Sequence, residues 1–436
     1  MAKRLKSLCN LILIVAIMLS VIAAFSGCDK DDDGSNRIFV MDLSYNPRTL
    51  DPQTAACRIS RMIIANIFEG LLKTDEQGEI IPAVAQSYSV SANGLEYTFV
   101  LRQDVYWSDG REFSEKCTAG DFVYAFERLF CPLLRSPHRA DYAAVQSVRD
   151  SDDYTLIITL TEASDDFLHL MTLPPSFPAN KAFVESTHGR YGLIGASVSG
   201  GVAVASNGAF VLREWVYDPW WKYENRIILR RNSSNDNEQS RIYPLGVNLL
   251  LDRGDVNQTN AVDLFLQGQS ALLVLGEQET SGTDRLSELE RAGFEYATSQ
   301  SAVWGFVFRE TGGLETLQRL SAHPVLILPM DSEAQPLLAE VSAVSQQWQE
   351  QLSLFCRIEP LTSGEFARRR GEGSYDIAAI SMDVRDYQRS QTEPDADEFI
   401  PFSFTTEHFF TQKNVEGLSY NSSTGVILFR DAVMGR

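Results

Sequence analysis

The side chains suited to nucleophilic, acid–base or metal chemistry are scattered along this sequence. The five histidines do not pair at the spacing that sets two metal ligands on one helix face, and HExxH does not occur. The run Gly195–Ser199 fails the G-x-S-x-G pattern of a serine nucleophile, because Ser199 stands where the second glycine is needed. With 58 acidic residues, carboxylate pairs are expected by chance. We therefore expect a protein that is not an enzyme and holds neither a metal nor a cofactor.

One cysteine stands in a context with a chemistry of its own. Three basic residues precede an apolar stretch over 8–25, and small residues then lead directly to Cys28. This order of regions is typical of a secretory signal. The small pair before Cys28 resembles the lipobox of bacterial lipoproteins, in which the thiol is acylated. The sequence thus predicts a signal peptide over 1–27, a lipid on Cys28 and a flexible tether over 28–36, with a single transmembrane anchor as the alternative.

The other cysteines do not form a disulfide framework. Thr118 and Asp121 form a variant of the capping box, and the apolar residues after them recur at helical spacing until Pro132. Cys117 and Cys131 flank this predicted helix, whose length of about 21 Å exceeds the reach of a disulfide. With no CxxC pair in the chain, we expect free thiols.

The charge balance argues against nucleic-acid binding. Lys and Arg number 38 against 58 acidic residues, which gives a formal net charge of −20. A duplex-binding surface needs clustered positive charge, and the only basic run, 368–370, is interpreted as the solvated end of a helix.

Apolar periodicity predicts an α/β protein with more than one lobe. The length of 436 residues exceeds what one core organises. Strands are predicted at 38–41, 97–101, 154–160, 325–328, 355–358 and 375–380. Helices are predicted at 61–72, 118–131, 336–352 and 365–370. In the C-terminal third, strands alternate with helices, which predicts parallel strands joined by right-handed crossovers.

Short motifs follow one another in a fixed order along the chain. They are LDP (50–52), IFEGLL (67–72), GEIIPAVAQSY (78–88), GLEYTFVLR (94–102), WSDG (107–110), TAGDFVYA (118–125), NGAFVLREW (207–215), IP (400–401) and NVEGL (414–418). Together they resemble the extracellular solute-binding proteins of family 5, the oligopeptide- and dipeptide-binding type.

The resemblance implies an α/β, periplasmic-binding-protein-like bilobal fold of type II with an extra domain, which closes by a hinge around its ligand. Lobe I would be discontinuous, and the extra domain would be inserted in it. The implied boundaries are 35–74, 200–300 and 401–436 for lobe I, 75–199 for the extra domain, and 301–400 for the second ligand-binding lobe. That second lobe is shorter than is usual in the family, both after Phe308 and between Tyr387 and Ile400.

The function implied by the resemblance is capture of peptides for uptake by an ABC importer. The partners would be a peptide or other small solute, the permease subunits of the importer, and the membrane through the N-terminal lipid. The protein would be an exported monomer on the outer face of the bacterial cell membrane or on its periplasmic side. A peptide would lie extended and pair its backbone with strand-like segments.

The resemblance also implies where the ligand's amino terminus binds. The family supplies an aspartate from a loop that follows a YDIA strand, which stands here at 375–378. An ammonium group closed off from water needs such a counter-charge. Asp386 and Tyr387 match the family's DY pair, and Asp383 is the second candidate for the carboxylate. Met382 replaces a tryptophan of the family's loop.

Two other functions remain open at this point. One is binding of a non-peptide solute, such as a metal chelate, haem or an oligosaccharide. The other is a lipid-anchored sensor or interaction protein that keeps the scaffold without transport.

Overall fold

The computed structural model describes most of the chain after residue 36. The described residues are 37–43, 46–75, 78–111, 113–194, 204–218, 225–237, 241–251, 261–276, 289, 291–310, 323–329, 335–384, 387, 399–421 and 426–435. The predicted signal peptide over 1–27, Cys28 and the whole tether over 28–36 lie outside them. Among the described residues, no helix combines the length and apolar character needed to span a membrane.

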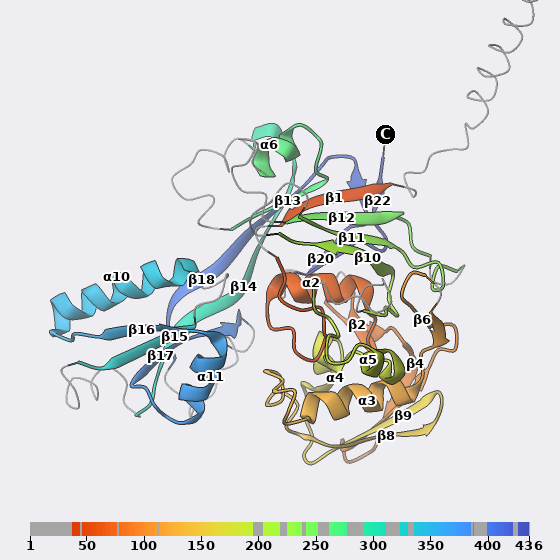
Figure 1. Ribbon diagram of the computed structural model, residues 1–436, viewed down its shortest axis with the longest axis horizontal. Coiled ribbons are helices and arrows are strands. Elements are labelled where there is room, and N and C mark those ends of the chain that lie inside the picture. Colours follow the sequence, from red (N-terminus) through yellow and green to blue (C-terminus); the bar gives the residue numbers. More distant parts are fainter. Residues whose placement is uncertain are drawn as a thin grey trace, which may run out of the picture.

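A ten-stranded mixed sheet runs through the molecule in the order β10-β11-β12-β1-β13-β18-β14-β17-β15-β16 (Figure 1). Its strands are β1 (Ile38–Leu43), β10 (Phe210–Val216), β11 (Arg226–Arg231), β12 (Gly246–Leu251), β13 (Leu272–Gly276), β14 (Glu295–Phe308), β15 (Val325–Pro329), β16 (Arg357–Leu361), β17 (Ile377–Asp383) and β18 (Phe399–Thr411).

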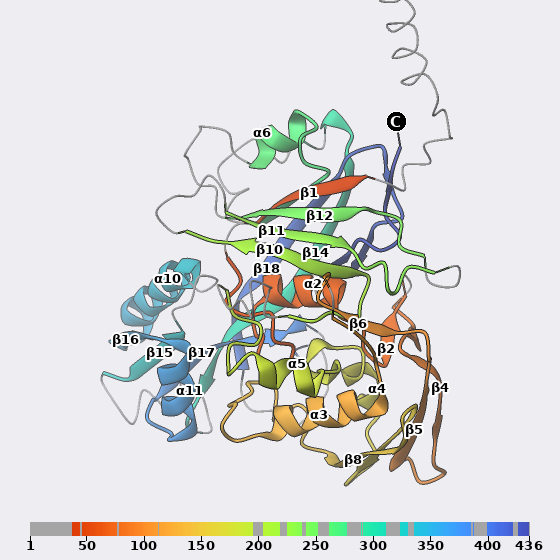
Figure 2. The same ribbon diagram turned by 45° about the vertical axis from the view of Figure 1, so that its right-hand side comes forward.

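The elements form two bodies, which remain apart when the molecule is turned (Figures 1 and 2). The first body carries β1, β10–β13, the elements from α2 to α5 along the chain, and the short C-terminal strands β19–β22. The second body carries β15–β17 with α10 (Gln335–Leu352) and α11 (Ser363–Gly371). The first body has a continuous core that includes Phe39, Trp107 and Phe429. The second body has a separate core around Phe306 and Trp348.

The first body contains a second, four-stranded sheet in the order β4-β5-β9-β8, with helices against it (Figure 2). Its helical elements are α2 (Arg58–Ile67), α3 (Ala119–Phe130), α4 (Phe167–Leu170), η1 (Pro174–Ser176), α5 (Lys181–Ser186) and α6 (Ala261–Leu266). Its further strands are β2 (Leu72–Thr74), β3 (Ile80–Pro82), β4 (Ala85–Val90), β5 (Glu96–Leu101), β6 (Tyr106–Ser108), β7 (Ser114–Lys116), β8 (Val145–Asp152), β9 (Thr155–Leu160), β19 (Val415–Glu416), β20 (Ser419–Asn421), β21 (Val426–Leu428) and β22 (Val433–Met434).

Two long antiparallel strands, β14 and β18, run through both bodies (Figure 1). At one end β18 pairs with β13 of the first body through Glu407 to Thr411. At the other end β14 pairs with β17 of the second body through Ala302 to Phe308. The register between the two strands shifts at Gln300/Ala302 and again at Trp304/Gly305. The positions 301 and 400, where the sequence suggested a change of lobe, thus lie inside continuous strands.

Helix α3 begins as its sequence predicts. Thr118 is the N-cap, and Asp121 completes a capping box. The Asp121 carboxylate accepts hydrogen bonds from the Thr118 backbone N–H (2.8 Å) and from Trp107 Nε1 (2.9 Å). Trp107 is fully buried, so this carboxylate joins the start of α3 to the core. Cys117 and Cys131 on either side of the helix are free, as expected.

The predicted helix over 61–72 is wrong at its C-terminal end. Helix α2 ends at Ile67, and Leu72 already begins strand β2. Gly70 lies against Phe177 so closely that an added Cβ would be 2.4 Å from the ring. The chain therefore leaves the helix but stays in the core, and its apolar residues continue the helical pattern past the true end of the helix.

The C-terminal α/β unit is confirmed in outline. β15 pairs in parallel with β16 and with β17, and α10 and α11 lie between them in sequence. The strand predicted at 355–358 begins instead at Arg357, and the side chain of Phe355 is 45% exposed.

Candidate ligand-binding site

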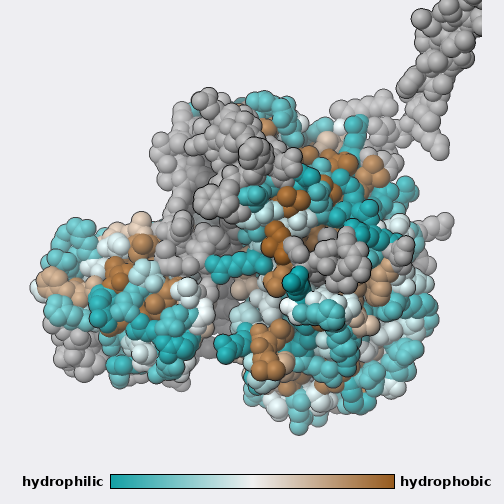
Figure 3. Space-filling view, in the orientation of Figure 1, coloured by the Kyte–Doolittle hydropathy of each residue, from teal (hydrophilic) through white to brown (hydrophobic). Residues whose placement is uncertain are grey.

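The space-filling view shows a hollow between the first and second bodies (Figure 3). Only a site in such a hollow can be contacted by both bodies at once. Two of the three sequence-predicted ligand residues are among the described residues: Asp383 ends β17 of the second body, and Tyr387 follows four residues later.

Tyr387 lies in an aromatic cluster on the second body. Its ring centroid is 5.7 Å from that of Phe399 and 6.1 Å from that of Phe404. Phe399 lies directly over β14, since a Cβ added at Gly305 would be 2.3 Å from its ring. Phe404 remains 36% exposed. The absence of a side chain at Gly305 thus lets this cluster form against the strand that joins the two bodies.

Of the two candidate carboxylate residues, only Asp383 is among the described residues. Asp383 is the last residue of β17, and its backbone pairs with Ala302 of β14. Strand β17 therefore ends at the level where β14 and β18 shift register. Asp386 lies outside the described residues. Their contact with a ligand stays a prediction.

On the first body, the segment before α2 is fixed by a buried ion pair. Asp51 contacts Arg128 of α3, and only 4% of Asp51 is exposed. Burial raises the pKa of Asp51, and the Arg128 guanidinium partly offsets this effect. Gln53 extends the link by donating its side-chain amide to the carbonyl of Phe177, at 3.0 Å. The turn over 50–55 is thereby held rigidly beside the start of α2.

Charged and titratable groups connect this segment to its surroundings. Arg58 Nη2, at the start of α2, lies 2.8 Å from Glu407 Oε1 of β18. His138 Nε2 lies 3.0 Å from the carbonyl oxygen of Ala55, and His138 Nδ1 lies 3.6 Å from Asp141 Oδ2. Both ring nitrogens of His138 therefore face oxygen atoms.

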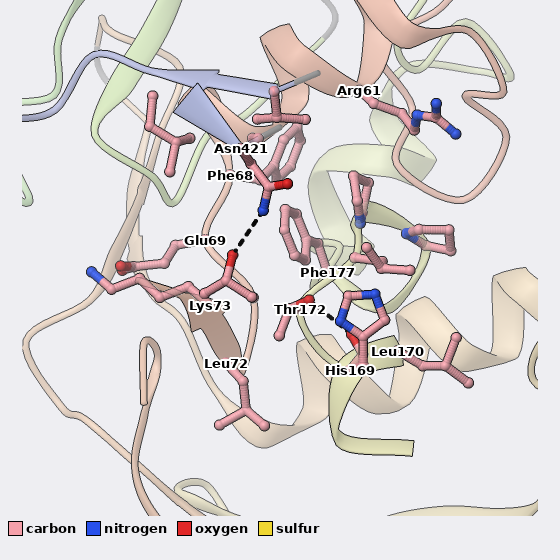
Figure 4. A pocket seen from close by; sticks show the side chains of 18 of the residues that line it. Arg61, Phe68, Glu69, Leu72, Lys73, His169, Leu170, Thr172, Phe177 and Asn421 are labelled. Atoms are coloured by element: carbon pink, nitrogen blue, oxygen red, sulfur yellow. Dashed lines mark hydrogen bonds between the residues drawn. The ribbon is translucent and has the colours of Figure 1, made fainter. Parts of the chain in front are cut away.

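A cavity of about 760 Å³ lies in the first body beside α2 (Figure 4). Phe68, Leu72 and Phe177 contribute apolar walls, while Arg61 and Lys73 contribute charge. Across it, Asn421 Nδ2 donates a hydrogen bond to Thr74 Oγ1 at 3.2 Å. The sequence did not predict this cavity. Its walls come from segments about 350 residues apart, and the IFEGLL motif that forms one wall resembles ordinary core sequence.

The central part of the chain matches a known protein family. Residues 79–239 match the model of a family described as bacterial extracellular solute-binding proteins, family 5 Middle. This segment includes the four-stranded sheet, α3, and strands β10 and β11 of the ten-stranded sheet.

The chain aligns with less than half of the length of two curated relatives. The chain is 29% identical over 233 residues to the probable deoxycholate-binding periplasmic protein YgiS of Escherichia coli, covering 50% of this chain and 40% of that protein. It is 30% identical over 202 residues to the periplasmic oligopeptide-binding protein OppA of Escherichia coli, covering 42% and 34%.

The fold is similar over a greater length. The solved structure of the Escherichia coli murein tripeptide binding protein MppA superposes with a TM-score of 0.68 at 18% identity, covering 92% of this chain and 99% of that chain. The bilobal α/β, periplasmic-binding-protein-like fold expected from the sequence is thus confirmed.

Proposed function

We propose that this chain is a bacterial extracellular solute-binding protein of family 5, the family whose model matches residues 79–239, and that it captures peptides between its two bodies and delivers them to an ABC importer. The observation that carries the proposal is the pair of bodies with separate cores, joined through β14 and β18. A ligand that touches both bodies stabilises their approach, so that capture and closure are one event.

The proposed peptide site uses both walls of the hollow. The segment after β17 supplies Asp386 for the ligand's ammonium group, with Tyr387 next to it in sequence and with Asp383, at the end of β17, as the second candidate. Tyr387 is already held by Phe399 and Phe404, which supports a fixed geometry for this wall. The enclosed ammonium requires a carboxylate partner because a buried unpaired charge costs several kcal/mol.

The proposal includes the lobe boundaries and the anchor predicted from the sequence. Lobe I comprises 35–74, 200–300 and 401–436, the extra domain 75–199, and the second lobe 301–400. Lipid on Cys28 holds an exported, monomeric protein at the outer face of the membrane or on its periplasmic side, and the permease of the importer is its partner. The names of both curated relatives describe periplasmic proteins, which supports the exported location.

A non-peptide solute is the second candidate ligand. One of the two curated relatives carries a name that describes deoxycholate binding, not peptide binding. The same hollow would serve either ligand, since the proposed closure requires only that the ligand contact both bodies.

The test is calorimetry with defined mixtures of short free-amine peptides, combined with X-ray scattering. Peptide capture predicts saturable binding, a smaller radius of gyration in the bound state and a melting temperature that rises with ligand concentration. Binding without compaction would contradict closure. Compaction by a non-peptide solute, with no response to peptides, would favour the second candidate. If neither class of ligand binds, the chain functions as a sensor or interaction protein without transport.

A further inference from the structure

The cavity beside α2 belongs to the first body alone. Its lining comes from four parts of the chain, namely 61–81, 138–177, Ala209 and 417–431. Among the described residues, none from the second body or from β14 and β18 contributes to it. A molecule bound there would need no closure of the two bodies. This separates the cavity from the proposed peptide site.

The walls of the cavity suit an apolar molecule of moderate size. Phe68, Leu72 and Phe177 are almost completely buried, and Pro174 and Pro175 extend the apolar surface. Figure 4 shows Phe68 and Phe177 near its centre, with Leu72 and Leu170 at its margin. A volume of about 760 Å³ lies within the range of sites that enclose small ligands. Burial of apolar ligand surface would therefore supply most of the binding energy.

Five of the described residues that line this cavity are acidic, and three of them, Glu69, Asp75 and Asp141, have the following partners within the protein; Asp166 and Asp431 are the other two. Glu69 Oε1 lies 3.2 Å from Arg430 Nη1. Asp141 pairs with His138, and Asp75 Oδ1 accepts a hydrogen bond from the Glu79 backbone N–H at 2.9 Å.

Lys73 differs from these acids. Its half-buried side chain makes no hydrogen bond or ion pair within the described part of the chain. Figure 4 shows it extended along one side of the cavity. A ligand that offers a negative group there would gain a charge-assisted contact without displacing any of the described residues from Lys73.

We propose that this cavity is a second binding site, for a small amphipathic carboxylate whose apolar part lies between Phe68 and Phe177 and whose carboxylate binds Lys73. The site goes beyond peptide capture, because it uses neither the hollow nor the loop after β17. A bound ligand would also contact both the β20–β21 hairpin, which contributes Asn421, and strand β2, which contributes Thr74; these two residues already share a hydrogen bond.

The test uses decanoate, below its micelle concentration, as the probe and measures binding to the full chain by calorimetry. Ala65 lies on α2 and lines the cavity, so Ala65→Trp should obstruct part of it and weaken decanoate binding. Ala339→Trp, at an exposed position of helix α10 in the second body, is the matched control and should leave decanoate binding unchanged. Lys73→Gln should weaken decanoate about tenfold but leave the uncharged decanol unchanged.

Three results would overturn the proposal. These are no saturable binding of decanoate to the wild type, unchanged binding in folded Ala65→Trp, and equal effects of Lys73→Gln on decanoate and decanol. Because Lys73 is only half buried, its variant remains informative if Ala65→Trp does not fold. Peptide binding is measured separately on the same variants and should persist in each of them. Loss of the carboxylate site and failure of the peptide function are therefore distinguishable.

Discussion

Arg58, at the first turn of α2, forms an ion pair of 2.8 Å with Glu407, a residue of β18 whose side chain is only 6% exposed. This contact joins the helix at the edge of the hollow to one of the two strands that run through both bodies. Glu407 pairs within the sheet with Gly276 on one side and Ser299 on the other, so its backbone position is fixed.

We expect Arg58→Ala to lower the free energy of unfolding by about 3 kcal/mol, because it removes a counter-charge from a buried carboxylate. Urea denaturation measures this loss. Arg357→Ala is the matched control, since Arg357 pairs with Glu359 at 2.8 Å but is 68% exposed, and it should cost less than about 1 kcal/mol. Equal losses in the two variants would show that burial of Glu407 does not matter.

Asp386→Asn should weaken binding of free-amine peptides at least about thirtyfold. It keeps the shape of the side chain while removing the counter-charge, and loss of one side of a buried charge pair costs about 2–5 kcal/mol. Calorimetry on the wild type and the variant measures the difference. N-acetylated peptides should bind poorly to both proteins.

Asp383→Asn is the internal control for this experiment. Asp383 ends β17, three residues before Asp386. If Asp383→Asn carries the loss instead, the aspartate was misassigned while the mechanism holds. If both variants bind like the wild type, the amine site is absent.

Stability should fall as the pH rises from about 4 to 6, through the titration of Asp121. Burial raises the pKa of Asp121 from 3.8 to about 6, against the effect of its hydrogen bonds from Thr118 and Trp107. The folded state therefore retains a proton that the unfolded state has already lost in this window, so the contribution is present below pH 4 and lost as the pH passes 6. At about 1.4 kcal/mol per pKa unit the change is about 3 kcal/mol.

Thermal or urea unfolding across this pH window measures the effect, with Asp121→Asn as the comparison. The asparagine keeps an acceptor for the Trp107 indole but does not titrate. The difference in stability between wild type and variant should therefore depend on pH between 4 and 6. Parallel pH profiles would contradict the assignment.

Cys28→Ala should move the protein from the membrane fraction to the soluble or precursor pool. Acylation of the Cys28 thiol cannot occur in this variant. Without acyl chains the protein loses the apolar anchor that holds it at the membrane. Fractionation with mass spectrometry of the mature N-terminus checks the outcome. Unchanged membrane partitioning with residues 1–27 intact would favour a transmembrane anchor.

Local sequence signals, such as a capping box and regular apolar spacing, were enough to predict helices α3 and α10. Helix α3 has its capping box and a regular apolar face, and α10 shows the same spacing through Leu337, Val341 and Trp348, all buried. The end of α2 was mispredicted because the chain beyond Ile67 remains in the core without being helical. Periodicity reports burial, and it specifies a helix only where burial and helix coincide.

Features that depend on distant segments were not predictable in this way. The long strands β14 and β18 mix polar and apolar residues, and β18 contains Pro401, a residue that disfavours a strand interior. Their length follows from having different neighbours at their two ends, β13 at one and β17 at the other. The cavity beside α2 was missed for the same reason, since no single segment encloses it.

The paired strands β14 and β18 restrict the directions in which the two bodies can move. Sliding one strand past the other by a single residue would break the ladder between them and turn every side chain to the opposite face. Bending or twisting the two-stranded ribbon retains most of its hydrogen bonds and is easiest at the irregular register beside Gln300. In the proposed closure, the two bodies would therefore approach one another by bending or twisting of this ribbon and not by sliding along it.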